Sequence, residues 1–233
     1  MKSTSIAAAF MVCALVSASA QTLEITNLSV NAQNKIVVGY PSDINSYFIL
    51  NRGITVTSIT SAATMTLGVS GGGQLTDPTS MTGVSRAFYS VQSVPVTAPH
   101  DTDADGIDDV YELQRSSILN PLNPADAAID SDGDAVSNFN EYRRGTDPSN
   151  AASKNTTLYV NSTAGSDAND GLAPAPTAWF GGTHAPKQTI QGAITVGVSG
   201  DNVSIAAGNY TQSVLDPGNK IISLTPQGNI SIQ

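Results

Sequence analysis

The sequence has 233 residues, a net charge of −9 and a single cysteine. This composition excludes a disulfide framework, and it lacks the basic patch that nucleic-acid binding requires. Its length allows one or two domains of roughly 100–200 residues each. The acidic residues are concentrated, because 12 of the 19 Asp and Glu residues lie between Asp101 and Asp147. A local cluster of this kind needs a positive partner.

The N-terminal residues are typical of a secretory signal peptide. Lys2 provides a positive start, residues 6–16 form an unbroken apolar run, and Ala18-Ser19-Ala20 fits the small-residue pattern of a cleavage site. We predict a signal peptide over residues 1–20, cleavage after Ala20, and a secreted, extracellular or cell-surface location. The apolar run is shorter than the roughly 20 residues of a transmembrane helix, so no membrane span is expected in the mature chain.

The only cysteine, Cys13, lies inside this signal, so the mature chain has none. A lipid-modified Cys13 is the less favoured alternative, because Val12 precedes it where a small residue is expected. Without thiols, a metal ion is the simplest way to stabilise a small module.

Residues 21–99 show the pattern of a β domain. Short β-branched or aromatic runs alternate with turn residues, which favours a small antiparallel β-sandwich-like domain with a structural or carbohydrate-facing role. Turns are expected at Gly71–Gly73 and at Asp77-Pro78. The predicted strands are Lys35–Tyr40, Tyr47–Leu50, Gly53–Ile59, Ala63–Val69 and Ala87–Val94.

Residues 101–112 read DTDADGIDDVYE, with carboxylates at loop positions 1, 3, 5, 9 and 12 and a glycine at position 6. Calcium takes 6–8 oxygen ligands at about 2.3–2.6 Å, and this spacing supplies them. Gly106 suits the sharp turn of the loop. The predicted ligands are Asp101, Asp103, Asp105, the backbone carbonyl of Ile107, Asp109 directly or through a water, and Glu112.

Residues 130–141 repeat the pattern as DSDGDAVSNFNE. Ala135 stands where the first loop has glycine, and a left-handed alanine costs on the order of 1 kcal/mol. One carboxylate is also missing, because Asn138 stands at position 9. We therefore expect the second site to be the weaker one, unless Asp147 adds an oxygen. Its predicted ligands are Asp130, Asp132, Asp134, the backbone carbonyl of Val136, Asn138 and Glu141.

These two loops and the connector LNPLNPADAAI (residues 119–129) resemble the thrombospondin type 3 calcium-binding repeats, in the bacterial form that shares the EF-hand loop spacing. The resemblance implies a calcium-dependent rigid spacer over residues 100–150 and implies no catalysis. A short helix is expected after each loop, the first stopped by Pro121 and the second by Gly145–Pro148.

Residues 151–157 have the small polar composition of a linker, and 158–233 contain predicted strands at 158–160, 202–206, 220–224 and 229–232 with a helix at 189–196. This segment resembles the opening of right-handed parallel β-helix proteins of the pectin-lyase-like group. The resemblance implies an N-terminal cap and the first coils. Because a solenoid needs several coils for stability, we expect the chain to be a fragment of a longer protein.

Two functions are compatible with these patterns. The favoured one is a calcium-binding structural or adhesion-type protein that is not an enzyme, with a polysaccharide or cell-surface glycan as a further candidate partner. The alternative is the N-terminal part of a β-helix polysaccharide lyase or glycoside hydrolase whose catalytic coils lie beyond this chain. Neither His100 nor His184 has a nucleophile at a recognisable spacing.

Two smaller features of the last segment have competing interpretations. The residues Asp167, Asn169 and Asp170 are interpreted as an Asx-rich turn, with a further cation site as the alternative. Trp179-Phe180 is expected to plug the end of a β-helix, with stacking on a sugar ring as the alternative.

Overall fold

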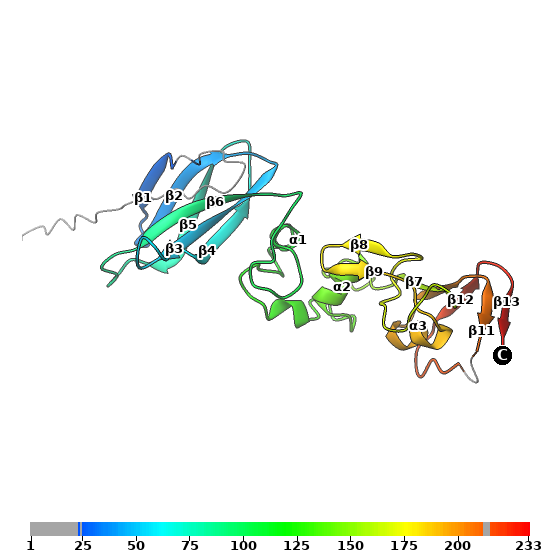
Figure 1. Ribbon diagram of the computed structural model, residues 1–233. Coiled ribbons are helices and arrows are strands. Elements are labelled where there is room, and N and C mark those ends of the chain that lie inside the picture. Colours follow the sequence, from blue (N-terminus) through cyan, green and yellow to red (C-terminus); the bar gives the residue numbers. More distant parts are fainter. Residues whose placement is uncertain (1–22, 24, 212–214) are drawn as a thin grey trace, which may run out of the picture. The chain divides into compact units, whose positions relative to one another are not determined.

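The computed structural model describes residues 23, 25–211 and 215–233, and the predicted signal peptide lies outside them. The described chain is mainly β, with short helices (Figure 1). It divides into two compact units, the first ending at Pro124 and the second running from Ala125 to Gln233. None of the described helices is long and apolar enough to cross a membrane.

The first unit contains two three-stranded antiparallel sheets, in the strand orders β1-β2-β5 and β4-β3-β6. Their facing side chains form one apolar core, which includes Val38 and Tyr40 from the first sheet and Phe48, Leu50 and Tyr89 from the second. The strands are β1 (Asn27–Val30), β2 (Lys35–Ser42), β3 (Ser46–Gly53), β4 (Ser61–Leu67), β5 (Gly71–Ser80) and β6 (Phe88–Pro95).

Two predictions for this unit are wrong. The segment predicted as a strand over Gly53–Ile59 is a turn that leads from β3 into β4, and its apolar residues Ile54 and Val56 face solvent. A Cβ on Gly53 would lie 1.9 Å from the Ser58 carbonyl oxygen, so only glycine permits this return of the chain.

The expected turns at Gly71–Gly73 and Asp77-Pro78 are instead parts of β5. Gly73 pairs with Tyr40, and a Cβ there would lie 2.5 Å from the tyrosine ring, so the glycine makes room for an aromatic core residue. Pro78 is tolerated because β5 is an edge strand. Asp77 is fully buried and accepts a hydrogen bond from the Tyr89 hydroxyl at 2.6 Å.

The outer face of the second sheet is covered by the segment that follows it. Tyr47 and Ile49 form a second apolar cluster with Met65 and Val94, and Val110 and Leu113 of α1 (Asp109–Leu113) pack against it. The helix expected after the first aspartate-rich loop is therefore present, although it ends at Leu113 and not at Pro121, and it attaches that loop to the sheet.

The second unit starts with a short 3-10 helix, η1 (Asp126–Ala128), and with α2 (Asn138–Arg144), the helix expected after the second loop. Gly145 ends α2 in a left-handed conformation with φ of 69°, as a C-terminal glycine cap does. The antiparallel hairpin β8 (Thr177–Trp179) and β9 (Gly182–His184) follows. Then comes α3 (Ile190–Val196), the helix that the sequence predicts over 189–196, and the Thr189 side chain caps its start.

The rest of the second unit is built from short parallel strands. β7 (Thr157–Val160), β10 (Asn202–Ile205) and β12 (Ser223–Pro226) form one sheet, and β11 (Gly208–Tyr210) pairs in parallel with β13 (Ile230–Ile232). Their apolar side chains meet α3 in one core that includes Leu158, Val203, Ile190 and Tyr210. The strand expected at 220–224 begins only at Ser223.

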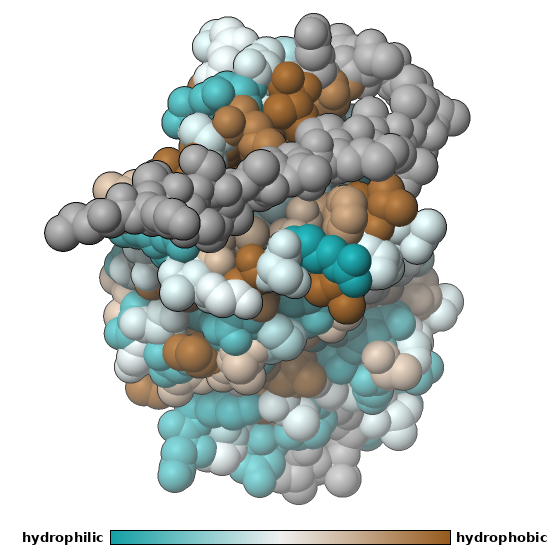
Figure 2. Space-filling model, turned by 90° about the vertical axis from the view of Figure 1, so that its left-hand side faces the viewer, coloured by the Kyte–Doolittle hydropathy of each residue, from teal (hydrophilic) through white to brown (hydrophobic). Residues whose placement is uncertain are grey.

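Most of the exposed large apolar side chains of the first unit lie in its loops, for example Ile44, Ile54 and Val69, and Val30 is exposed at the end of β1. On the face drawn in Figure 2, hydrophobic residues are interspersed with hydrophilic ones. Scattered exposure of this kind is ordinary for a protein surface.

Candidate metal centres

Each predicted loop brings its first three aspartates together. Carboxylate oxygens of Asp101, Asp103 and Asp105 lie within 4.8 Å of one another, and so do those of the second triad. The second triad consists of Asp130, Asp132 and Asp134. Both triads could hold a metal ion.

The two loops are built in the same way. The carboxylate at position 1 accepts hydrogen bonds from the backbone N–H groups of positions 5 and 6, which Asp101 receives at 3.2 and 2.9 Å and Asp130 at 3.1 and 2.8 Å. The carboxylate at position 5 accepts from the N–H of position 7, at 2.8 Å for both Asp105 and Asp134. These short-range bonds curl the backbone around the carboxylates.

The apolar side chains at position 7 anchor the loops. Ile107 is fully buried and Val136 is 4 % exposed. The carbonyl groups of both residues are the ones expected to face an ion.

Each loop has two left-handed residues rather than the one predicted. In the first loop these are Ala104 (φ 64°) at position 4 and Gly106 (φ 97°) at position 6. In the second loop the order is reversed, with Gly133 (φ 81°) at position 4 and Ala135 (φ 74°) at position 6. Ala135 therefore has the conformation that the sequence predicts, but the first loop has an equivalent alanine. Backbone strain does not distinguish the two loops.

Four oxygen atoms of the second loop are buried and have no hydrogen-bond partner among the residues that the structure describes. They are Oδ2 of Asp132, Oδ2 of Asp134, Oδ1 of Asn138 and Oε2 of Glu141. An unsatisfied buried polar atom costs about 1–3 kcal/mol. A bound cation would give all four atoms a partner, and they belong to four of the predicted ligands.

The pKa values of the carboxylates in the second loop also favour a bound cation. Burial raises the pKa of Asp132, and the charge of Asp134 adds to this shift. The pKa of Glu141 is raised from 4.5 to about 7, first by burial and then by the charges of the three aspartates, although the Thr146 hydroxyl that donates to it opposes the shift. In the metal-free loop, keeping these two carboxylates ionised therefore costs free energy.

The backbone N–H groups of Ala135, Gly133 and Asp134 donate to Asp130 and hold the pKa of this exposed carboxylate below its usual value.

Glu112, at position 12 of the first loop, is as fully buried as Glu141. One of its oxygens lies within 4.8 Å of a carboxylate oxygen of Asp105.

Asp109, at position 9 of the first loop, connects the loop to the sheet. Its Oδ2 accepts hydrogen bonds from the Tyr47 hydroxyl at 2.8 Å and the Thr102 hydroxyl at 2.7 Å, and its Oδ1 accepts one from the Thr102 N–H at 2.8 Å. The Tyr47 hydroxyl also accepts the N–H of His100 at 2.9 Å. The sequence spacing suggested Asp109 as a ligand and contained no signal for Tyr47, which lies 62 residues earlier.

Asn138 is the corresponding residue of the second loop. Its Nδ2 donates to the Asp126 carbonyl at 2.8 Å, and its N–H donates to the Ile129 carbonyl at 2.8 Å. The side-chain amide is therefore oriented with Oδ1 facing away from the Asp126 carbonyl. In the first loop, the N–H of Asp109 donates to the His100 carbonyl in the same way.

Two arginines of α2 link the second loop to the parallel strands. Nη2 of Arg144 contacts both carboxylate oxygens of the fully buried Asp201, at 2.7 and 2.8 Å, and the Arg143 guanidinium contacts Asp170 at 3.2 Å. Lys154 donates to the backbone carbonyl of Asp134 in the loop itself, at 3.3 Å. Sequence reasoning did not identify these contacts, because the partners are up to 57 residues apart.

No family model, curated protein or solved structure matches this chain.

The segment Asp167–Asp170 forms a turn stabilised by its own side chains. The Asp167 carboxylate accepts from the N–H and hydroxyl groups of Thr189, and the Asn169 amide donates to the Pro186 carbonyl. Asp170 accepts from the N–H of Leu172 and contacts Nδ1 of His184 at 2.6 Å. Among the described residues these three side chains do not form a converging acidic cluster of the kind found in the loops.

Proposed function

We propose that this chain is a calcium-binding structural protein whose two aspartate-rich loops each bind one calcium ion. The observation that supports this most directly is the set of four buried, unsatisfied oxygen atoms in the second loop, on side chains at positions 3, 5, 9 and 12. Calcium is favoured over a softer metal because every predicted ligand is an oxygen. The matching hydrogen bonds of the first loop extend the proposal to that site.

The proposed role of calcium is to order the end of each unit. Without a cation, the clustered carboxylates repel one another, and ion binding and ordering are coupled. We extend the proposal to the repeat type and the folds of the two units. The loops are thrombospondin type 3-like repeats, the first unit is a β-sandwich, and the parallel strands of the second unit are the first coils of a β-helix in a secreted or cell-surface protein.

Isothermal titration calorimetry of the full chain tests the proposal. We expect about two calcium ions per chain, with affinities near the 10⁻⁴–10⁻³ M of extracellular calcium modules, and weaker binding of magnesium, which demands a smaller octahedral site. The Asp103→Ala, Asp132→Ala double variant is expected to lose both sites.

The matched control is Asp216→Asn, because Asp216 is exposed and lies outside both loops. This variant is expected to bind calcium as the unmodified chain does. Absence of calcium binding in the unmodified chain, or unchanged binding in the double variant, would overturn the proposal.

A further inference from the structure

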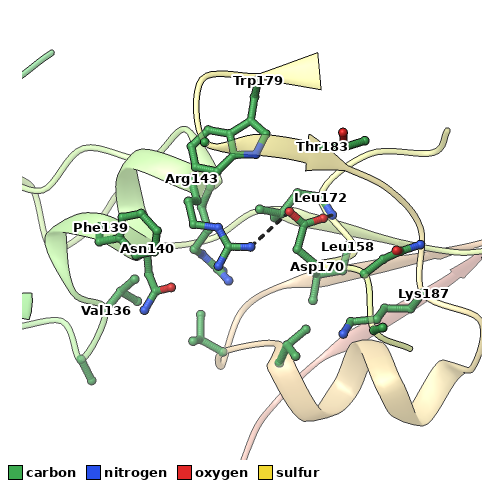
Figure 3. A pocket seen from close by; sticks show the side chains of 17 residues that line it. Val136, Phe139, Asn140, Arg143, Leu158, Asp170, Leu172, Trp179, Thr183 and Lys187 are labelled. Carbon is green, nitrogen blue, oxygen red and sulfur yellow. Dashed lines mark hydrogen bonds and ion pairs between the residues drawn. The ribbon is translucent and has the colours of Figure 1, made fainter. Parts of the chain in front are cut away.

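The second unit contains a cavity of about 630 Å³ (Figure 3). Its volume lies within the roughly 300–1,000 Å³ that is typical of small-molecule sites. Its apolar lining includes Val136, Phe139, Leu158, Leu172 and Val196. The cavity therefore offers an apolar surface for the carbon skeleton of a ligand.

A buried cation lines this cavity. Lys187 is 5 % exposed, and its ammonium group donates to the Asp167 carbonyl oxygen at 2.9 Å. An ammonium group has three N–H donors. In the part of the chain that the structure describes, no carboxylate oxygen lies within 4.0 Å of Lys187. Burial lowers the pKa of Lys187 and the Arg143 charge adds to this, although Asp167 and Asp170 oppose it.

Two arginines also line the cavity. Arg143 lines the cavity and is 28 % exposed, and Nε of Arg144 is buried without a hydrogen-bond partner among the described residues. The only acidic residue in the described lining is Asp170, whose Oδ2 already contacts both Arg143 and His184. Arg144 is already paired with Asp201 and Arg143 with Asp170, so Lys187 is the cation of the described lining without a carboxylate oxygen within 4.0 Å, and Figure 3 shows Lys187 and Arg143 on different sides of the cavity.

We propose that this cavity binds a small organic carboxylate, with Lys187 and Arg143 donating hydrogen bonds to the carboxylate and the apolar walls contacting the rest of the molecule. Polar groups for orientation are close at hand, since Asn140 and Thr183 also line the cavity. The proposal does not depend on calcium binding at the neighbouring loop, because its cations come from α2 and from the segment before α3.

The test uses cyclohexanecarboxylate and its neutral analogue cyclohexanecarboxamide, which have the same apolar body. Trp179 is the only tryptophan of the chain and lines the cavity, so its fluorescence reports on occupancy. Titrations of the full chain at constant ionic strength, with and without calcium, are expected to give a saturable signal for the carboxylate. The amide is expected to bind at least about tenfold more weakly, the loss that corresponds to a hydrogen bond with a charged group.

Substitution of the two proposed cations tests whether they bind the carboxylate. Lys187→Met is expected to weaken carboxylate binding at least about tenfold, and Arg143→Gln provides the same test if the lysine variant does not fold. Arg86→Gln is the matched control, because Arg86 is an exposed arginine of the first unit. Equal binding of acid and amide, no saturable signal, or an equal loss in the Arg86→Gln variant would overturn the proposal.

Discussion

Two alanines, Ala104 and Ala135, hold left-handed backbone conformations in the aspartate-rich loops. Each loop combines one alanine and one glycine at its left-handed positions, in opposite order. The sequence pattern revealed only Ala135, because position 6 is where glycine is expected and position 4 has no such expectation. The prediction of a weaker second site was argued partly from this residue, and that argument fails because the first loop carries the same strain.

Exchanging glycine and alanine at these positions tests the strain directly. Gly133→Ala is expected to lower the free energy of unfolding by less than about 1 kcal/mol, because the left-handed strain is partly offset by the lower chain entropy of alanine and no atom lies within 4 Å of the added Cβ. Ala135→Gly is expected to raise it by less than about 1 kcal/mol, since the added chain entropy of glycine offsets part of the relief.

Urea denaturation at saturating calcium measures both changes. Ala128→Gly is the control, an exposed residue that is not among the positive-φ residues of the described chain, and it is expected to lower stability. A stabilising effect of Gly133→Ala would contradict the assigned conformation.

Glu141 makes the metal-free protein sensitive to pH. Its pKa is about 7 in the folded chain and near 4.5 when unperturbed, so between these values the folded state binds more protons than the unfolded state. The free energy of unfolding of the calcium-free chain is therefore expected to fall as pH rises from about 4.5 to about 7. Calcium binds the deprotonated carboxylate, so calcium affinity should fall as pH drops below about 7.

Chemical denaturation of the calcium-free chain across this pH range gives the profile. Glu141→Gln removes the titrating group, and its profile should be flatter by the contribution of Glu141. Coinciding profiles for the two proteins would refute the assignment.

At the level of elements, the short strands rich in β-branched and aromatic residues were predictable, because local composition determines them. The predictions at Lys35–Tyr40, Tyr47–Leu50 and Ala87–Val94 are confirmed. The error at Gly71–Gly73 arose where a distant part of the chain decides the conformation, because Tyr40 fills the space left by Gly73. The error at Gly53–Ile59 arose from a tight local turn, in which Gly53 approaches the Ser58 carbonyl.

In the loops, too, local features were predictable from the sequence and long-range contacts were not. Their spacing predicted both aspartate triads, because the residues of a triad are only four positions apart. The bonds of Asp109 to Tyr47 and of Arg144 to Asp201 connect residues 62 and 57 positions apart. No local pattern in the sequence reports such contacts.

The Arg144–Asp201 ion pair attaches α2 to the parallel strands. Both side chains are largely withdrawn from solvent, with 8 % and 0 % exposure. Removing one partner leaves an uncompensated buried charge, so Arg144→Met is expected to lower the free energy of unfolding of the second unit by about 3 kcal/mol.

Thermal unfolding followed by Trp179 fluorescence measures the effect in the second unit. Arg86→Met removes an exposed arginine of the first unit and should leave this transition unchanged. A loss much below about 1 kcal/mol for Arg144→Met would mean that the pair does not hold α2 in place.

For the whole molecule, the important feature is that the two loops fall into different compact units. Calcium is therefore expected to stabilise each unit through its own loop. Asp103→Asn should remove the calcium-dependent rise in melting temperature of the first unit and leave that of the second, and Asp132→Asn should have the reverse effect.

Differential scanning calorimetry with and without calcium, with Trp179 fluorescence marking the second unit, separates the two effects. Each variant serves as the control for the other. If either substitution abolished the calcium response of both units, the loops would not act separately.

The register of the parallel strands limits how this chain can change in evolution. Asn202 pairs with Ser223 and Gly208 with Ile230, so the last two layers are separated by 21 and 22 residues, whereas Thr157 and Asn202 of the first pair of strands are 45 residues apart. Duplication or loss of a segment of that length would preserve the alignment of inward and outward side chains. Insertion of one residue within a strand would turn the following side chains to the opposite face. Viable length variants of this region should therefore differ by whole layers or be confined to the turns.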